Sequence, residues 1–250
     1  MRSLWKIFFS RLLGIAIIIM LLPLVIQVVR IIWFMSRTSY SLAPFTQNNQ
    51  NAKIKILFVG DSTAVGTGAA NNQQSVAGWL GKYYPTAHID NWGRNGLRLA
   101  DLATWFDPAM AKIHYEVVIL QIGGNDILRF TNLKNVERDL MTVLERAKIV
   151  GKHVVILHSG NVGLSPIFIW PFDWIFTERT RSVREIYAQK TKETGAIYID
   201  LFTERQHDPF FSNNELNLYS SDYLHPSGLG YVSWYARMRL ILDVEHVPFD

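Results

Sequence analysis

The N-terminal part of the chain contains its longest apolar run. Residues 12–29 carry no charged side chain, and after Arg30 residues 31–35 are apolar again. A helix over residues 12–29 would be ~27 Å long at ~1.5 Å per residue, close to the hydrocarbon thickness of a bilayer. The long side chain of Arg30 can reach the polar surface of a membrane. The pattern therefore predicts a transmembrane helix, and we expect residues 1–38 to form a membrane anchor.

Two other interpretations of this segment stay open from the sequence. A buried helix of a soluble domain can be equally apolar, although such a helix normally shows a polar face. A cleaved signal peptide is the second alternative, because Ser41, Leu42 and Ala43 form a small-x-small pattern. Pro44 follows that pattern, however, and the apolar run is long for a signal sequence.

The charges that flank the apolar run predict its orientation. Basic residues are more frequent on the cytoplasmic side of a membrane span. Three of them precede the run and two follow it, namely Arg2, Lys6, Arg11, Arg30 and Arg37. The bias favours a cytoplasmic N-terminus and a domain on the extracytoplasmic, periplasmic side of the membrane.

The remaining chain divides into a polar stretch and a globular domain. Residues 39–52 are rich in Asn and Gln and contain Pro44, which is typical of a linker. From residue 53 to residue 250, short apolar runs alternate with helical patterns. The runs predict strands at residues 54–59, 87–91, 116–122, 153–158 and 196–201. The helical patterns lie at residues 75–84, 97–106, 133–150, 178–193 and 226–244.

This alternation is typical of a parallel sheet covered by helices on both faces. We therefore expect an α/β fold, a three-layer α/β/α sandwich. In such sheets, active sites lie at the carboxyl ends of the strands.

Composition excludes several kinds of chemistry. The chain has no cysteine, so disulfides, a thiol nucleophile and thiolate metal sites are excluded. The net charge of +4 is modest and the charges are mixed in sign along the domain, so no nucleic-acid partner is expected. The histidines are scattered without the spacing of metal ligands, and we expect no metal site.

Candidate catalytic residues follow the predicted strands. Ser62 comes directly after the first strand, and a serine hydroxyl becomes a good nucleophile only when a base takes its proton. Asp222 and His225 stand three residues apart before the last helix, a spacing that lets the carboxylate orient the imidazole. Donors for an oxyanion are available from Asn125 and from a glycine within residues 91–96.

These segments resemble the four sequence blocks of the SGNH (GDSL-type) hydrolases. The blocks occur in the family's order as Gly60-Asp61-Ser62, Asn91-x-Gly93-x-x-Gly96, Gly123-Gly124-Asn125-Asp126 and Asp222-x-x-His225-Pro226. The resemblance implies a flavodoxin-like α/β/α sandwich with a five-stranded parallel sheet. It also implies hydrolysis of esters or thioesters through an acyl-serine, without metal or cofactor.

Position within the blocks implies a role for each residue. Ser62 is the nucleophile and its own N–H the first oxyanion donor. The Gly96 N–H and the Asn125 side chain are the other donors. His225 is the general base, and Asp222 orients it.

Other residues near these blocks receive structural interpretations. Gly93 is assigned to the turn, although an exchange of roles with Gly96 stays open. Asp61 and Asp126 are expected to hold their loops by hydrogen bonds. His158, at the end of a strand on the same edge, is expected to pack in the core, with contact to substrate as the alternative.

An aromatic segment follows the strand that ends at His158. Residues 164–176 hold two tryptophans, three phenylalanines and two prolines. Because the segment leaves the same sheet edge as Ser62, we expect Trp170 and Trp174 to wall the substrate site or to touch the bilayer. The alternative is a loop that folds its aromatic side chains onto the core.

Together these patterns predict a membrane-anchored serine hydrolase that acts on lipid-derived or cell-envelope acyl esters. Its expected partners are an ester substrate and a membrane. Two alternatives stay open: a non-catalytic envelope protein that binds acylated ligands, and an O-acyltransferase that uses the same residues.

Overall fold

A five-stranded parallel sheet forms the centre of the domain. The computed structural model describes residues 2–212 and 217–247. The strands are β1 (Lys55–Gly60), β2 (His88–Asn91), β3 (Tyr115–Gln121), β4 (Gly151–Leu157) and β5 (Ile197–Ile199). They are ordered β2-β1-β3-β4-β5, with every pairing parallel. The predicted α/β/α sandwich with five parallel strands is confirmed.

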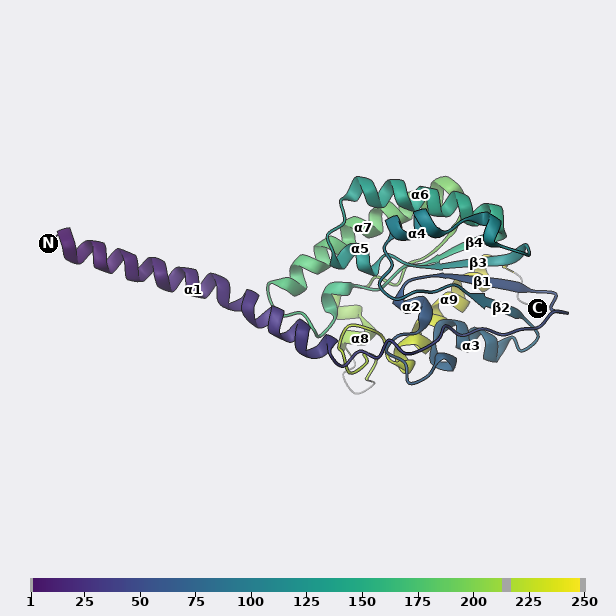
Figure 1. Cartoon of the computed structure of the whole chain (residues 1–250), viewed down its shortest axis with the longest axis horizontal. Coiled ribbons are helices and arrows are strands. Elements are labelled where there is room, and N and C mark those ends of the chain that lie inside the picture. Colours follow the sequence, from purple (N-terminus) through teal and green to yellow (C-terminus); the bar gives the residue numbers. More distant parts are fainter. Residues whose placement is uncertain (1, 213–216, 248–250) are drawn as a thin grey trace.

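Helices cover both faces of this sheet. They are α2 (Ser62–Val65), α3 (Val76–Tyr83), α4 (Leu99–Trp105), α5 (Gly124–Leu128), α6 (Leu133–Val150), α7 (Phe172–Thr194), α8 (Pro209–Ser212) and α9 (Gly228–Val244). Short 3₁₀ turns span Asn72–Gln74, Pro108–Met110, Val162–Leu164 and Arg205–His207. In Figure 1, α4, α6 and α7 lie above the sheet, and α3 and α9 lie below it.

The apolar pattern of the strands explains the two layers. Successive strand residues point to opposite faces. Leu57 and Val59 of β1 therefore join the core under α4, α6 and α7, whereas Ile56 and Phe58 join the core over α3 and α9. A strand buried on both faces favours a near-continuous apolar run, as β3 shows from Val117 to Leu120.

Helix α7 begins earlier than the sequence pattern indicated. It starts at Phe172, whereas the pattern placed its start at residue 178. Pro171 occupies the position just before the first helical residue, where a missing backbone N–H costs no helical hydrogen bond. The last part of the aromatic segment is therefore helical.

Helix α1 (Arg2–Met35) extends away from the domain as a single long helix (Figure 1). Within it, Arg11–Met35 is long and apolar enough to cross a membrane. Most of its large apolar side chains from Leu12 onward are exposed, which argues against the core helix of a soluble protein. A signal segment near an N-terminus would pass the same test of length and composition.

The C-terminal part of α1 is docked on the domain. Gln27 is only 2% exposed, and its amide donates to the Ile167 carbonyl at 3.0 Å. The side-chain oxygen of Gln27, Oε1, accepts from the Ile169 N–H at 3.0 Å. Arg30 donates to the carbonyls of Pro166 at 2.7 Å and Ile167 at 3.3 Å. These bonds fix the end of α1 against residues 166–169.

The expected linker, residues 39–52, connects α1 to the sheet and is packed against the domain. Gln47 exchanges two backbone hydrogen bonds of 2.9 Å with Ile89, and its side chain donates to the carbonyls of Tyr84 and Ala87. Phe45 packs against the core between the sheet and α3. Because β2 is an edge strand with unpaired backbone groups, a polar segment that pairs with it is stabilised there.

His158 follows β4 and is completely buried. Its ring lies 4.4 Å from the Tyr187 ring, and its Nδ1 is 3.2 Å from the Tyr198 hydroxyl. The structure thus gives His158 the expected packing role. Burial lowers the pKa of His158 from 6.5 to about 4, because the charged ring loses its hydration.

The buried ring predicts a specific acid sensitivity. Below pH 6.5 an unfolded histidine binds a proton, whereas folded His158 stays neutral down to about pH 4, so stability falls as pH drops through this window. We expect His158 to account for a loss of about 2–3 kcal/mol in the free energy of unfolding between pH 7.5 and pH 4.5. Urea unfolding of the detergent-solubilised chain at both pH values measures this loss. His158→Phe should show a correspondingly smaller loss, and equal losses in both proteins would contradict the prediction.

Candidate active site

The nucleophile candidate lies where β1 gives way to α2. A Cβ on Gly60 would collide with the Gln121 carbonyl oxygen of β3, so only glycine lets the two strand ends approach this closely. Asp61 then caps α2 by accepting from the N–H and hydroxyl of Thr63 at 2.9 and 2.8 Å. This cap presents Ser62 at the first turn of α2, above the carboxyl edge of the sheet.

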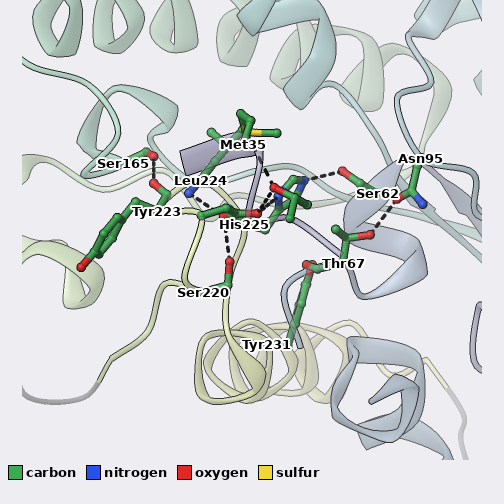
Figure 2. A network of polar contacts seen from close by, with 12 residues as sticks. Met35, Ser62, Thr67, Asn95, Ser165, Ser220, Tyr223, Leu224, His225 and Tyr231 are labelled. Carbon is green, nitrogen blue, oxygen red and sulfur yellow. Dashed lines mark hydrogen bonds and ion pairs between the residues drawn. The ribbon is translucent and has the colours of Figure 1, made fainter. Parts of the chain in front are cut away.

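Ser62, His225 and Asp222 form one hydrogen-bonded chain, of which Ser62 and His225 are labelled in Figure 2. The Ser62 Oγ lies 3.0 Å from Nε2 of His225, and Nδ1 of His225 lies 2.8 Å from Oδ2 of Asp222. The structure therefore brings together the three residues that the sequence assigned to nucleophile, base and orienting acid. With Nδ1–H donated to the carboxylate, Nε2 is the ring nitrogen that can accept the serine proton.

Asp222 is held by donors on both oxygens. Its Oδ1 accepts from the backbone N–H groups of Leu224 and His225, each at 2.9 Å, and from the Ser220 hydroxyl at 2.7 Å. Burial alone would raise the pKa of Asp222, but the hydrogen bonds and the charge of His225 hold it well below its usual range. Asp222 thus remains a carboxylate that can stabilise a protonated His225.

Two further aspartates have the structural roles expected for them. Asp126 accepts from the Leu99 N–H at 2.9 Å and so ties the loop before α4 to α5. Burial raises the pKa of Asp61 to about 6, and its hydrogen bonds to Thr63 offset part of that effect.

The residues expected to donate to an oxyanion also lie at the site. Gly96 has φ +78°, a conformation that favours glycine, and it lines the cavity above Ser62. The Gly93 N–H is instead bound to Asn91 Oδ1 at 2.9 Å, which supports the assignment of Gly93 to the turn. Asn125 lines the same cavity and donates one Nδ2–H to the Leu97 carbonyl at 3.0 Å. That bond orients the amide and leaves its second N–H for a ligand.

A cavity of about 700 Å³ opens over these residues. Its catalytic end is formed by Ser62, Gly96, Asn125 and His225. Its apolar walls are formed by Leu128, Val162, Leu201, Phe202, Phe210 and Trp234. This volume lies in the range of small-molecule sites and suits an acyl group.

Three contributors to the site were not found from the sequence. Met35, at the end of α1, and Tyr40 line the cavity, and the Thr38 hydroxyl donates to Asp222 Oδ2 at 2.8 Å. No motif marks these residues. Only the docking of α1, which depends on contacts more than a hundred residues apart, brings them to the site.

Trp170 and Trp174 do not line this cavity. They are 76% and 61% exposed, so the expectation that they wall the substrate site differs from the structure. The segment divides instead: Ile167, Phe168 and Phe176 are buried in the core, and the two tryptophans face outward beside the docked end of α1.

The described residues, 2–212 and 217–247, contain no group of three histidine or carboxylate side chains that could hold a metal ion. A hydrogen-bonded serine, histidine and aspartate beside amide donors and an apolar cavity instead suit acyl transfer to and from the serine.

Comparisons with known proteins agree with this geometry. No curated protein matches the chain in sequence. Among solved structures, the chain is similar to a lipolytic protein of the G-D-S-L family from Veillonella parvula, with 18% identity over 76% of this chain and 98% of that one, at a TM-score of 0.60. A lipase/acylhydrolase from Enterococcus faecalis is 18% identical over 77% and 96% of the two chains, with a TM-score of 0.58.

An acetylxylan esterase from Geobacillus stearothermophilus is also similar, with 21% identity over 76% of this chain and 94% of the esterase and a TM-score of 0.52. At these identities the likeness shows a shared fold. The profile of the GDSL-like lipase/acylhydrolase family matches residues 58–232, which include all four motif segments. The chain therefore belongs to the GDSL-like lipase/acylhydrolase family.

Proposed function

We propose that this protein hydrolyses carboxylic esters of lipid-derived or cell-envelope acyl groups through an acyl-Ser62 intermediate, at a membrane that α1 spans. The observation that carries the proposal is the chain of 3.0 and 2.8 Å contacts from Ser62 to His225 to Asp222, open to a largely apolar cavity of about 700 Å³.

The geometry supports a two-step reaction. His225 Nε2 takes the proton of Ser62 as Oγ attacks the ester carbonyl, and the protonated His225 then gives that proton to the departing alcohol. The C–O bond to the alcohol breaks and leaves an acyl-serine. A water then attacks the acyl carbonyl while His225 takes its proton, and His225 gives that proton to Ser62 Oγ as the acyl–Oγ bond breaks and the carboxylic acid leaves. In both steps the oxyanion accepts from the N–H groups of Ser62 and Gly96 and from Asn125.

The substrate class follows from the cavity and from α1. An apolar wall stabilises an acyl chain, and an enzyme anchored by α1 meets esters that partition into or lie next to the membrane. The flanking charges favour the extracytoplasmic side for the domain. A screen of the full-length protein with p-nitrophenyl esters from acetyl to palmitoyl, acyl-CoA, lysophospholipid and acetylated glycans tests this class. Transfer of the acyl group to an added alcohol in place of water would identify an acyltransferase.

We expect Ser62→Ala to reduce hydrolysis by about 10³–10⁶-fold, because only binding and the oxyanion donors remain. The measurement is the initial rate on the best ester of the screen, with circular dichroism as a check on the fold. A fluorophosphonate probe should label the wild-type chain at Ser62. Full activity in Ser62→Ala, or labelling of another serine, would refute its role as nucleophile.

Asn125→Ala should lower kcat by about 10²–10³-fold with a smaller change in KM, since the amide donates most strongly when negative charge develops on the carbonyl oxygen. Steady-state kinetics give both parameters. Asn135→Ala, which removes an exposed amide from α6, is the matched control and should behave as wild type. A change confined to KM would instead make Asn125 a substrate-binding residue.

The exposed tryptophans beside α1 are expected to lie at the membrane interface, where Trp is favoured. Replacing both Trp170 and Trp174 with serine should lower the rate on long-chain esters in vesicles several-fold, while the rate on soluble p-nitrophenyl acetate stays close to wild type. Tyr83→Ser, at an equally exposed aromatic residue on α3, is the control. Equal losses on both substrates together with a lower Tm would show that the tryptophans only stabilise the fold.

A further inference from the structure

The chain that leaves α1 contacts the catalytic acid. Thr38 Oγ1 donates to Asp222 Oδ2 at 2.8 Å. Asp222 Oδ2 also accepts from His225 Nδ1, at 2.8 Å. Thr38 follows the last residue of α1 by three positions, and its N–H is bound to the Met35 carbonyl at 3.1 Å. The Thr38 hydroxyl is therefore fixed relative to the end of α1.

A second contact joins α1 to the loop that carries Asp222 and His225. The Phe34 ring meets the Tyr223 ring edge-on, with 4.7 Å between centroids. Tyr223 has φ +56°, an uncommon conformation for a non-glycine residue, which persists only where its surroundings hold it. Phe34 is one of those surroundings.

The docking segment of the domain provides a third connection. Ile167, whose carbonyl accepts from Gln27 and Arg30 of α1, donates its N–H to the Tyr223 carbonyl at 3.3 Å. The Ser165 hydroxyl donates to that same carbonyl (Figure 2). The position of α1 is thus transmitted to Tyr223 through the backbone of residues 165–167.

We propose that Thr38 is a positioning residue for Asp222, so that the docked end of α1 is part of the active site and not only a tether. Asp222 Oδ1 is fixed by two backbone amides and Ser220, whereas Oδ2 is shared by His225 and Thr38. A donor from Thr38 holds Oδ2 in the direction of His225 Nδ1. Without that donor the carboxylate can turn and the His225 ring loses its fixed orientation towards Ser62. The proposal rests on the catalytic roles proposed above.

The test compares Thr38→Val, which removes the hydroxyl at nearly constant volume, with Thr38→Ser, which keeps it. Both are measured as full-length protein in nanodiscs with p-nitrophenyl butyrate. Thr38→Val should lower kcat by about 3- to 30-fold, part of the value of a hydrogen bond to a charged group, with KM nearly unchanged. Thr38→Ser should restore most of the wild-type kcat. Ser39→Ala, which removes an exposed hydroxyl at the next residue, is the matched control and should match wild type.

Two further readouts separate positioning from a purely structural role. The rate at which a fluorophosphonate labels Ser62 should fall in parallel with kcat, because it reports the nucleophile without the ester. Thr38→Val should cause no further loss in an Asp222→Asn background, since a residue that acts through Asp222 has nothing left to position. Independent, multiplied losses would overturn the proposal.

Undocking α1 should lower kcat in the same way. The double variant Gln27→Leu, Arg30→Leu removes the side-chain hydrogen bonds from α1 to residues 166–169 and keeps the helix apolar. The protein should still pellet with membranes while kcat falls as in Thr38→Val. An unchanged kcat in the double variant would overturn the dependence on docking.

The outcomes also distinguish this inference from the proposed function. If Asp222→Asn keeps wild-type kcat, the proposed triad fails and this inference fails with it. If Asp222→Asn is strongly impaired while Thr38→Val keeps wild-type kcat, the inference alone is overturned.

Discussion

The Asp222 carboxylate is 1% exposed yet keeps its charge, and the surrounding structure supplies what water would otherwise provide. An isolated buried carboxylate is strongly unfavourable unless donors and a positive partner surround it. This requirement shapes the loop from Ser220 to His225, in which two backbone N–H groups and a hydroxyl point at one oxygen. Tyr223, with φ +56°, lies in the turn between Asp222 and His225 that brings the His225 N–H to one Asp222 oxygen and the His225 ring to the other.

The second requirement is that residues far apart in the chain meet at one sheet edge. Neighbouring parallel strands end at the same edge of the sheet. Ser62 after β1, Gly96 after β2 and Asn125 after β3 therefore lie close together as a result of the strand order alone. For that reason strand periodicity and four short motifs were enough to predict the fold and the motif residues of the candidate site, but not the residues that α1 and the segment after it contribute. Some motif residues make hydrogen bonds to residues nearby in the sequence, as Asp61 does when it caps α2 through Thr63. Such local interactions can be predicted from the sequence.

What the sequence did not reveal depends on contacts between distant segments. In the sequence, nothing marks Gln27 within its apolar run or Thr38 after the helix. Their hydrogen bonds become apparent only when α1 is docked against residues 166–169. Composition likewise indicated a linker for residues 39–52 but not the pairing of Gln47 with Ile89 at the edge strand β2. Of the two positions expected for Trp170 and Trp174, the wall of the substrate site differs from the structure, whereas contact with a bilayer stays a prediction. The aromatic content of a loop does not tell which of its side chains face the core and which face outward.

Docking of α1 also constrains where the domain lies relative to a bilayer. The undocked stretch between Arg11 and Gln27 is ~24 Å long at ~1.5 Å per residue, somewhat shorter than the ~30 Å hydrocarbon layer. With α1 across a membrane, residues 166–169 therefore lie close to the headgroups, and Trp170 and Trp174 lie at the depth where indole rings are favoured. Met35, which lines the cavity, lies about two helical turns after Gln27 at the end of α1, and Tyr40, which also lines it, follows in the segment after the helix. With α1 across a membrane, its docking contacts therefore also hold the cavity close to the membrane surface.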